Sequence, residues 1–202
     1  MRSDSKGELM RHTKTGIINT ALMRVGAQGV TAAFQDAPAA QTAAAAYDRA
    51  LGCCLALHPW NFAVRHAALA QRAGPAAPGW RHAWSLPADC LRIVEVLGED
   101  GRRIAWALSG TGGGETLHTR AGGVTLRYVS GQVAAFPSAF ADALAWRVAV
   151  EIAPYVQQGG GRARDYLELF ERALDRARTE NDLALAPERA FRSAFLAARM
   201  VC

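Results

Sequence analysis

The histidines of this chain are the first candidates for acid–base chemistry or metal binding. They are His12, His58, His66, His82 and His118. They share no spacing with one another, or with an acidic residue, that matches a metalloenzyme motif. His58 stands directly before Pro59, so we interpret it as a helix-terminal residue near the C-terminal dipole rather than as a catalytic base. The histidines therefore predict no metal site and no catalytic centre.

Serine and glycine give no stronger signal. Neither Ser109 nor any other serine lies in a Gly-x-Ser-x-Gly nucleophile elbow. Residues 110–114 read Gly-Thr-Gly-Gly-Gly, but this run lacks the Gly-Lys-Ser/Thr ending of a phosphate loop and precedes a predicted strand rather than a helix. We interpret it as a flexible connection between strands. The sequence predicts that the protein is not an enzyme and needs no cofactor.

Cysteine spacing provides no scaffold. Cys53 and Cys54 are adjacent on a predicted helix, where their side chains diverge by about 100°. Cys90 and Cys202 stand alone, and no Cys-x-x-Cys pair occurs. These features predict reduced, buried thiols in a protein made in the cytoplasm.

Composition bounds the remaining possibilities. The chain has 202 residues, a net charge of +5 and an isoelectric point near 9.4, which weakly favours an acidic partner. The basic residues are spread along the chain, whereas a nucleic-acid footprint would cluster them. No apolar run approaches the ~20 residues of a membrane-spanning helix, and no signal peptide precedes the helices. We expect a single soluble domain with no membrane partner.

The spacing of apolar residues predicts two helical parts. Apolar residues recur at helical spacing from Ile17 to Val25, and Gly26 would end that helix. A second, alanine-rich helix would run from about Pro38 to His58. Helical spacing returns from about residue 137 to residue 184. The helical parts are therefore expected at about 13–58 and 137–184.

Between these parts the period changes to that of strands. Short segments separated by Gly or Pro occupy about residues 62–130, and Val124–Val129 alternates most clearly. Residues 98–101 and 121–123 are the expected hairpin turns. The predicted fold class is α+β, a mainly α-helical bundle with an inserted small antiparallel β subdomain.

Large aromatic residues gather where the first helical part meets the strands. The expected structural core here consists of Trp60, Phe62, Trp80, Trp84 and Pro87. A second interpretation, that the tryptophans stack on nucleic-acid bases, would need interleaved basic residues. Single arginines beside strands do not meet that need.

The C-terminal tail, residues 187–202, combines apolar and basic side chains. Its apolar residues would form one helical stripe, so the tail either packs on its own body or docks into a partner subunit as a helix in a groove. We favour a partner-interface element. The expected contact residues are Arg189, Phe191, Arg192, Phe195, Leu196, Arg199 and Met200.

The order of short motifs resembles the tail tubular protein A family, the head-to-tail adaptors of short-tailed bacteriophages. The motifs are the Ile17–Leu22 opening, Tyr47 in the second helix, His58-Pro59-Trp60-Asn61-Phe62-Ala63, Trp80, Leu86-Pro87-Ala88-Asp89-Cys90-Leu91-Arg92, Leu126-Arg127-Tyr128 and the helix headed by Phe140. The likeness covers about residues 15–182, so the tail and the first 12 residues lie outside it.

The resemblance implies a structural virion protein of the tail or neck. Such proteins form a twelve-subunit ring beneath the portal protein, receive the tail nozzle below and extend the channel through which double-stranded DNA passes as non-specific cargo. They carry no catalytic residues. The alternative, from the basic isoelectric point and the arginines of the tail, is a basic helical DNA-binding protein.

Overall fold

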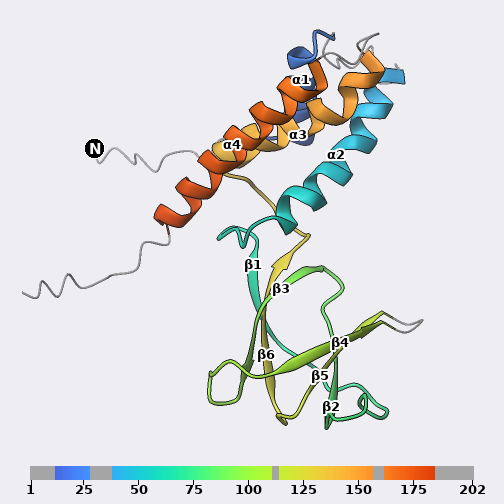
Figure 1. Ribbon diagram of the computed structural model, residues 1–202, viewed down its shortest axis with the longest axis vertical. Coiled ribbons are helices and arrows are strands. Elements are labelled where there is room, and N and C mark those ends of the chain that lie inside the picture. Colours follow the sequence, from blue (N-terminus) through green and yellow to red (C-terminus); the bar gives the residue numbers. More distant parts are fainter. Residues whose placement is uncertain (1–11, 28–37, 111–113, 157–161, 185–202) are drawn as a thin grey trace, which may run out of the picture.

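The structure is a computed structural model of the chain, and it describes residues 12–27, 38–110, 114–156 and 162–184. Within these ranges the elements follow the order α1, α2, six strands, α3, α4. Their bounds are α1 Lys14–Arg24, α2 Pro38–Ala56, β1 Val64–Ala68, β2 His82–Ser85, β3 Cys90–Gly98, β4 Trp106–Gly110, β5 Glu115–Thr119, β6 Val124–Ser130, α3 Ser138–Val156 and α4 Ala163–Ala184. The helices form one end of the molecule and the strands the other (Figure 1).

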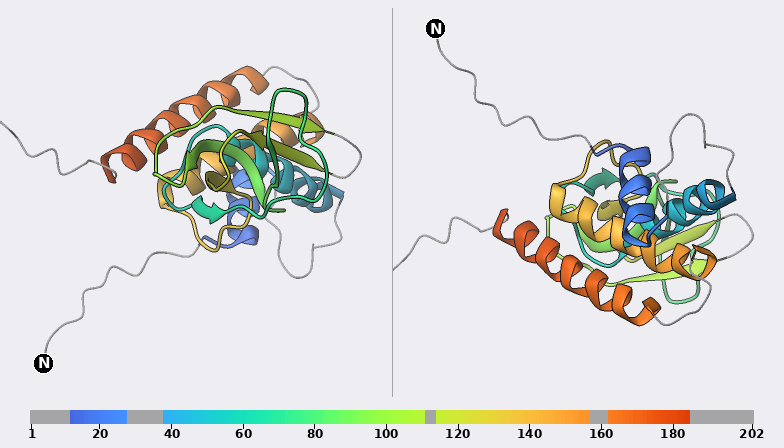
Figure 2. Two further views of the ribbon diagram at one scale, coloured as in Figure 1. Left: turned by 90° about the horizontal axis from the view of Figure 1, so that it is seen from below. Right: turned by 90° about the horizontal axis from the view of Figure 1, so that it is seen from above.

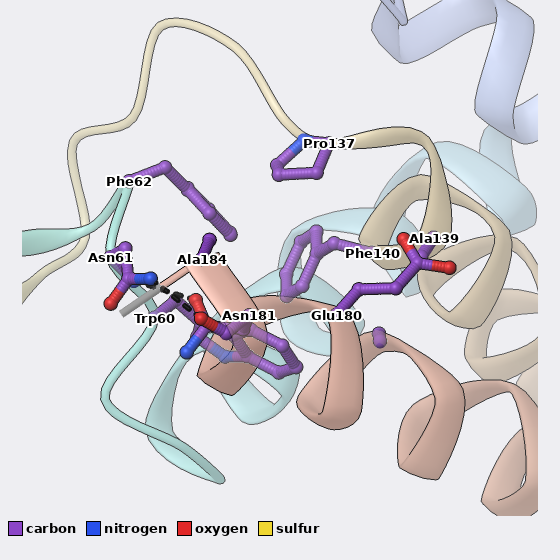
Figure 3. A pocket seen from close by; sticks show the side chains of 10 residues that line it. Trp60, Asn61, Phe62, Pro137, Ala139, Phe140, Glu180, Asn181 and Ala184 are labelled. Atoms are coloured by element: carbon purple, nitrogen blue, oxygen red, sulfur yellow. Dashed lines mark hydrogen bonds between the residues drawn. The ribbon is translucent and has the colours of Figure 1, made fainter. Parts of the chain in front are cut away.

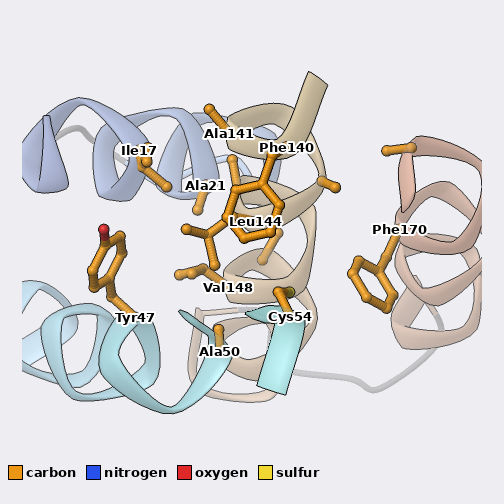
Figure 4. Packing of buried hydrophobic residues seen from close by; sticks show 14 of the residues in the cluster. Ile17, Ala21, Tyr47, Ala50, Cys54, Phe140, Ala141, Leu144, Val148 and Phe170 are labelled. Atoms are coloured by element: carbon orange, nitrogen blue, oxygen red, sulfur yellow. The ribbon is translucent and has the colours of Figure 1, made fainter. Parts of the chain in front are cut away.

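Helix α3 is the centre of the helical end. It packs against α1, α2 and α4, and α1 and α4 lie on opposite sides of it (Figure 2). Alanine and larger apolar residues cover most of its circumference, as expected for a helix surrounded by others. Leu144 and Val148 point towards α1 and α2 (Figure 4), and Phe140 belongs to the same buried cluster. The small alanine side chains at the same interfaces let the helix backbones approach closely.

The ends of α1 follow local rules. The Thr13 side chain accepts a hydrogen bond from the Gly16 backbone N–H at 3.0 Å and so caps the first turn. Gly26 adopts a φ of 78°, a left-handed conformation, and the Ala27 N–H then reaches the Leu22 carbonyl at 2.9 Å. The prediction that Gly26 ends this helix is confirmed.

The strands form two antiparallel sheets of three strands each. Their orders are β1-β6-β3 and β2-β5-β4. Apolar side chains from both sheets meet in one cluster, which includes Trp84 of β2, Leu117 of β5 and Leu126 of β6. The predicted alternation of β6 is confirmed, because Val124, Leu126 and Tyr128 are buried. This cluster is separate from the helical core.

The prediction of a mainly helical bundle with a small β subdomain is wrong. In the described residues the chain has four helices and two three-stranded sheets, with 45% helix and 25% strand, which is an α+β fold. The physical reason is that the two sheets bury an apolar cluster of their own. They do not merely attach to a helical core.

Of the two expected hairpin turns, the one at 98–101 is confirmed and the one at 121–123 is wrong. At 98–101 the chain reverses, Arg103 bridges Leu97 in antiparallel fashion, and the Gly98 N–H donates to the Arg102 carbonyl at 2.9 Å before β4 joins the other sheet. The turn at 121–123 leads from β5 to β6, and these two strands belong to different sheets. The strands that pair across a short connection are β4 and β5, on either side of the glycine-rich run. Turn residues show where the chain reverses. The partner of each strand depends on which side chains share the cluster.

Candidate binding site at the junction of helices and sheets

The segment from His58 to Phe62 joins α2 to β1, and Trp60 is its anchor. After α2 ends at Ala56, the Trp60 indole N–H turns back and donates a hydrogen bond to the Cys54 carbonyl at 2.9 Å. The same carbonyl also accepts a longer hydrogen bond, of 3.4 Å, from the Leu57 backbone N–H, so the indole strengthens the end of the helix. Trp60 is 1% exposed, so its ring is fully enclosed.

Aromatic rings surround Trp60 on the side of α3. The Trp60 and Phe140 ring centroids are 4.9 Å apart at an interplanar angle of 76°, and those of Phe62 and Phe140 are 5.0 Å apart at 69°. Phe136 approaches Phe140 at 5.4 Å. Edge-to-face contacts of this kind add about 0.5–1.5 kcal/mol each beyond burial of area. The segment is thereby fixed against the start of α3.

The last turns of α4 hold the same segment from the other side. The Asn181 side-chain oxygen accepts a hydrogen bond from the Asn61 backbone N–H at 2.8 Å, and the Asn61 amide donates to the Asn181 backbone carbonyl at 2.8 Å. His58 Nε2 lies 3.0 Å from a carboxylate oxygen of Asp182 and 3.1 Å from the amide nitrogen of Asn181. The His-Pro-Trp-Asn-Phe motif therefore connects α2, α3 and α4.

A pocket of about 210 Å³ opens beside this connection (Figure 3). We call it the junction pocket. Its walls are mainly apolar and are formed by Trp60, Asn61, Phe62, Pro137, Ala139, Phe140, Ala177, Glu180, Asn181 and Ala184. The four residues from α4 recur at positions i, i+3, i+4 and i+7, so they form one stripe of that helix. Glu180 is exposed at this stripe and brings a negative charge to an otherwise apolar opening.

A serine–histidine pair that no sequence motif indicated lies in the second sheet. The Ser109 hydroxyl of β4 lies 2.7 Å from Nε2 of the buried His118 of β5, beside a second hollow of about 440 Å³ that Arg72 and Thr116 also line. Because the two residues lie nine positions apart on paired strands, no local motif could reveal their contact. This is the arrangement closest to a nucleophile and base among the described residues.

The hydrogen-bond partners of His118 argue against catalysis by this pair. The Ala77 backbone N–H donates to His118 Nδ1 at 3.3 Å, so Nδ1 carries no proton and the neutral ring holds its proton on Nε2. The ring then donates to Ser109 and cannot accept the serine proton, as a general base must. A triad would instead place a carboxylate at Nδ1. We conclude that the pair fixes the 72–77 loop against the sheet.

The turn formed by residues 86–92 is held by the side chain of Asp89. The Asp89 carboxylate accepts hydrogen bonds from the hydroxyls of Ser130 and Tyr128, and Arg65 lies 3.3 Å from one of its oxygens. The hydrogen bond from Ser130 is the largest of the effects that lower the pKa of Asp89, while burial raises the pKa of Tyr128. This polar cluster ties the turn to β1 and β6.

The predicted core residues divide between the two clusters. Trp60 belongs to the helical core and Trp84 to the cluster between the sheets, where its indole N–H donates to Thr119 at 2.8 Å. Phe62 and Pro87 are partly buried. Trp80 is also partly buried, with the Arg120 guanidinium 5.8 Å from the centre of its ring.

The predicted interface residues of the tail, 187–202, lie outside the described residues.

Burial raises the pKa of Cys54 to about 12, so this thiol stays protonated and unreactive at neutral pH. Among the residues that the structure describes, no cluster of His, Cys, Asp and Glu could hold a metal ion. None of the described helices is long and apolar enough to cross a membrane.

Comparison with known proteins adds no relative. No protein-family model matches the chain, and no curated protein matches it.

Proposed function

We propose that the chain is a structural virion protein, a head-to-tail adaptor of a short-tailed bacteriophage. Its subunits form a ring between the portal protein and the tail nozzle, twelve-membered as in the family that the chain resembles. The ring lines the channel through which DNA leaves the head. The protein is made in the host cytoplasm and ends in the neck of the virion.

The observation that carries this proposal is the ordered set of short motifs in which the sequence resembles such adaptors. Two of these motifs have clear structural roles here. The His58–Phe62 segment joins three helices, and the Leu86–Arg92 turn closes on Asp89. Residues that maintain a fold rather than perform a reaction are what an adaptor requires.

The shape of the molecule gives this proposal physical support. The helical end and the sheet end have separate apolar cores and lie one above the other along the longest axis (Figure 1). An elongated subunit with two distinct ends can contact one partner above and another below. Its long sides are then free for the heterologous subunit contacts that close a ring.

The alternative, a basic DNA-binding protein, has less support. Many arginines of the described chain already pair with carboxylates, among them Arg24 with Asp142, Arg127 with Glu95 and Arg147 with Glu151. A paired arginine contributes less to a field that attracts phosphate. A gel-shift titration with duplex DNA at physiological salt should show only weak, sequence-independent binding.

Electron microscopy of the purified protein mixed with its portal protein tests the adaptor function. The expected result is a single added ring on the portal face from which the tail extends. Portal particles that remain bare, or virions in which the protein lies inside the capsid, would refute the proposal.

A further inference from the structure

The junction pocket lies at the end of the last described helix, where the C-terminal segment begins. Ala184 is the last residue of α4 and lines the pocket. Eighteen further residues, 185–202, follow. We propose that this segment folds back over the junction pocket of the same chain and inserts Phe191 into it.

The pocket has the size and chemistry for one aromatic ring. An apolar cavity of roughly 150 Å³ is enough to take up benzene, and the junction pocket holds about 210 Å³. Phe62 and Phe140 present their rings to its interior (Figure 3), so an entering phenyl ring would add to an existing aromatic cluster. Ala177 and Ala184 leave the space on the α4 side, because their side chains end at Cβ.

The sequence of residues 185–202 contains a proline that favours a reversal of the chain and a phenylalanine ring that could enter the pocket. Pro187 cannot continue α4, since it has no N–H to donate, and it favours a break there. Phe191 is the first aromatic residue beyond the break, and Phe195 follows at i+4, on the same side of a helix. Helices joined by connections of 2–5 residues pack as antiparallel hairpins, which would return the segment along α4.

The negative charge of Glu180 at the edge of the junction pocket is complementary to the arginines that flank Phe191. Glu180 lines the pocket and has no ion-pair partner among residues 12–27, 38–110, 114–156 and 162–184. Arg189 and Arg192 flank Phe191 in the sequence. With Phe191 in the pocket, either guanidinium can reach the Glu180 carboxylate and form a charge-assisted hydrogen bond.

The connection through Ala184 favours the chain's own segment over that of a second copy. A short linker holds its ligand at an effective concentration in the millimolar range, well above that of a separate copy in dilute solution. Phe191 is seven residues from Ala184, and seven extended residues reach about 23 Å. The tail is thus bound to its own body in the free chain, in contrast to the partner interface expected from sequence.

Photo-crosslinking of the full chain tests this proposal. The photoreactive amino acid p-benzoylphenylalanine replaces Phe191, and a second preparation carries it at Phe195. Unlabelled and nitrogen-15-labelled chains are mixed, irradiated and digested, and the crosslinked peptides are identified by mass spectrometry. The expected result is crosslinks to residues 60–62 or 137–140 in which both peptides carry the same isotope.

Two substitutions at the end of α4 provide the matched comparison. Ala184→Phe should fill the pocket from its α4 wall and abolish the crosslinks. Leu183→Phe adds similar bulk at a neighbouring position that is 69% exposed and does not line the pocket, so the crosslinks should remain. Circular dichroism checks that both variants stay helical.

Three results would overturn the proposal. Crosslinked peptides of mixed isotope would show that the tail enters the pocket of a second copy. Crosslinks to the pocket that survive Ala184→Phe would show that the ring lies elsewhere on this surface. Absence of crosslinks to residues 60–62 and 137–140 from both photoreactive positions would show that the segment does not cover the pocket.

Discussion

Replacing Trp60 by alanine should destabilise the protein more than replacing the partly buried Trp80. The side chain is 1% exposed, its ring centroid lies 4.9 Å from that of Phe140, and its indole N–H donates a hydrogen bond to the Cys54 carbonyl. Loss of a buried Trp costs about 3–5 kcal/mol, through lost transfer energy and the cavity that remains. Loss of the indole hydrogen bond adds about 0.5–1.5 kcal/mol, because the Cys54 carbonyl keeps only its longer contact with the Leu57 N–H.

Comparison with two further variants separates these contributions. Trp60→Phe keeps most of the ring contact but removes the indole N–H, so it should cost about 1–3 kcal/mol. Trp80→Ala should cost less than Trp60→Ala, because Trp80 is only partly buried and packs beside Arg120 at the surface. Wild type serves as the reference for all three.

Urea unfolding followed by far-ultraviolet circular dichroism measures these differences as changes in the free energy of unfolding. The expected order of cost is Trp60→Ala, then Trp60→Phe and Trp80→Ala. A Trp60→Ala variant within about 1 kcal/mol of wild type would refute the reasoning, since no fully enclosed ring of this size can be removed so cheaply.

Three further predictions concern polar groups. The hydrogen bond from Ser130 lowers the pKa of Asp89 from 3.8, so the carboxylate contributes its full stabilisation above about pH 4–5 and loses it as the pH falls through the folded-state pKa. Asp89→Asn should therefore make thermal stability depend less on pH between about pH 5 and 3. An unchanged slope of melting temperature against pH would contradict this. Asn181→Ala removes the side-chain oxygen that accepts from the Asn61 backbone N–H, while the Asn181 backbone carbonyl can still accept from the Asn61 amide. This change should cost about 1–3 kcal/mol in urea unfolding, and a neutral effect would show that the junction does not depend on the side-chain hydrogen bond. A fluorophosphonate probe should not label Ser109, because His118 donates to it rather than activating it, and stoichiometric labelling would instead establish a nucleophile.

Local chemistry by itself determined the helix ends and the positions of the strands. Gly26 ends α1 because only a residue that tolerates positive φ lets the chain turn there, and Pro59 stops α2 because it lacks an N–H. The alternation of Val124, Leu126 and Tyr128 predicted both the strand and its buried face. These features depend on residues a few positions apart, which is the range that a sequence pattern can report.

Only the tertiary structure decided which strands pair and which residues meet at the junction pocket and at the Ser109–His118 pair. Ser109 meets His118 only because β4 pairs with β5, and Asn61 meets Asn181 across 120 positions because α4 packs along α3. Likewise, the turn residues at 121–123 cannot reveal that the chain changes sheet there. The physical reason is that burial rewards any contact that removes apolar area from water, whatever its separation along the chain, and so many pairings satisfy the same local pattern. Which of them forms depends on how the whole set of side chains packs.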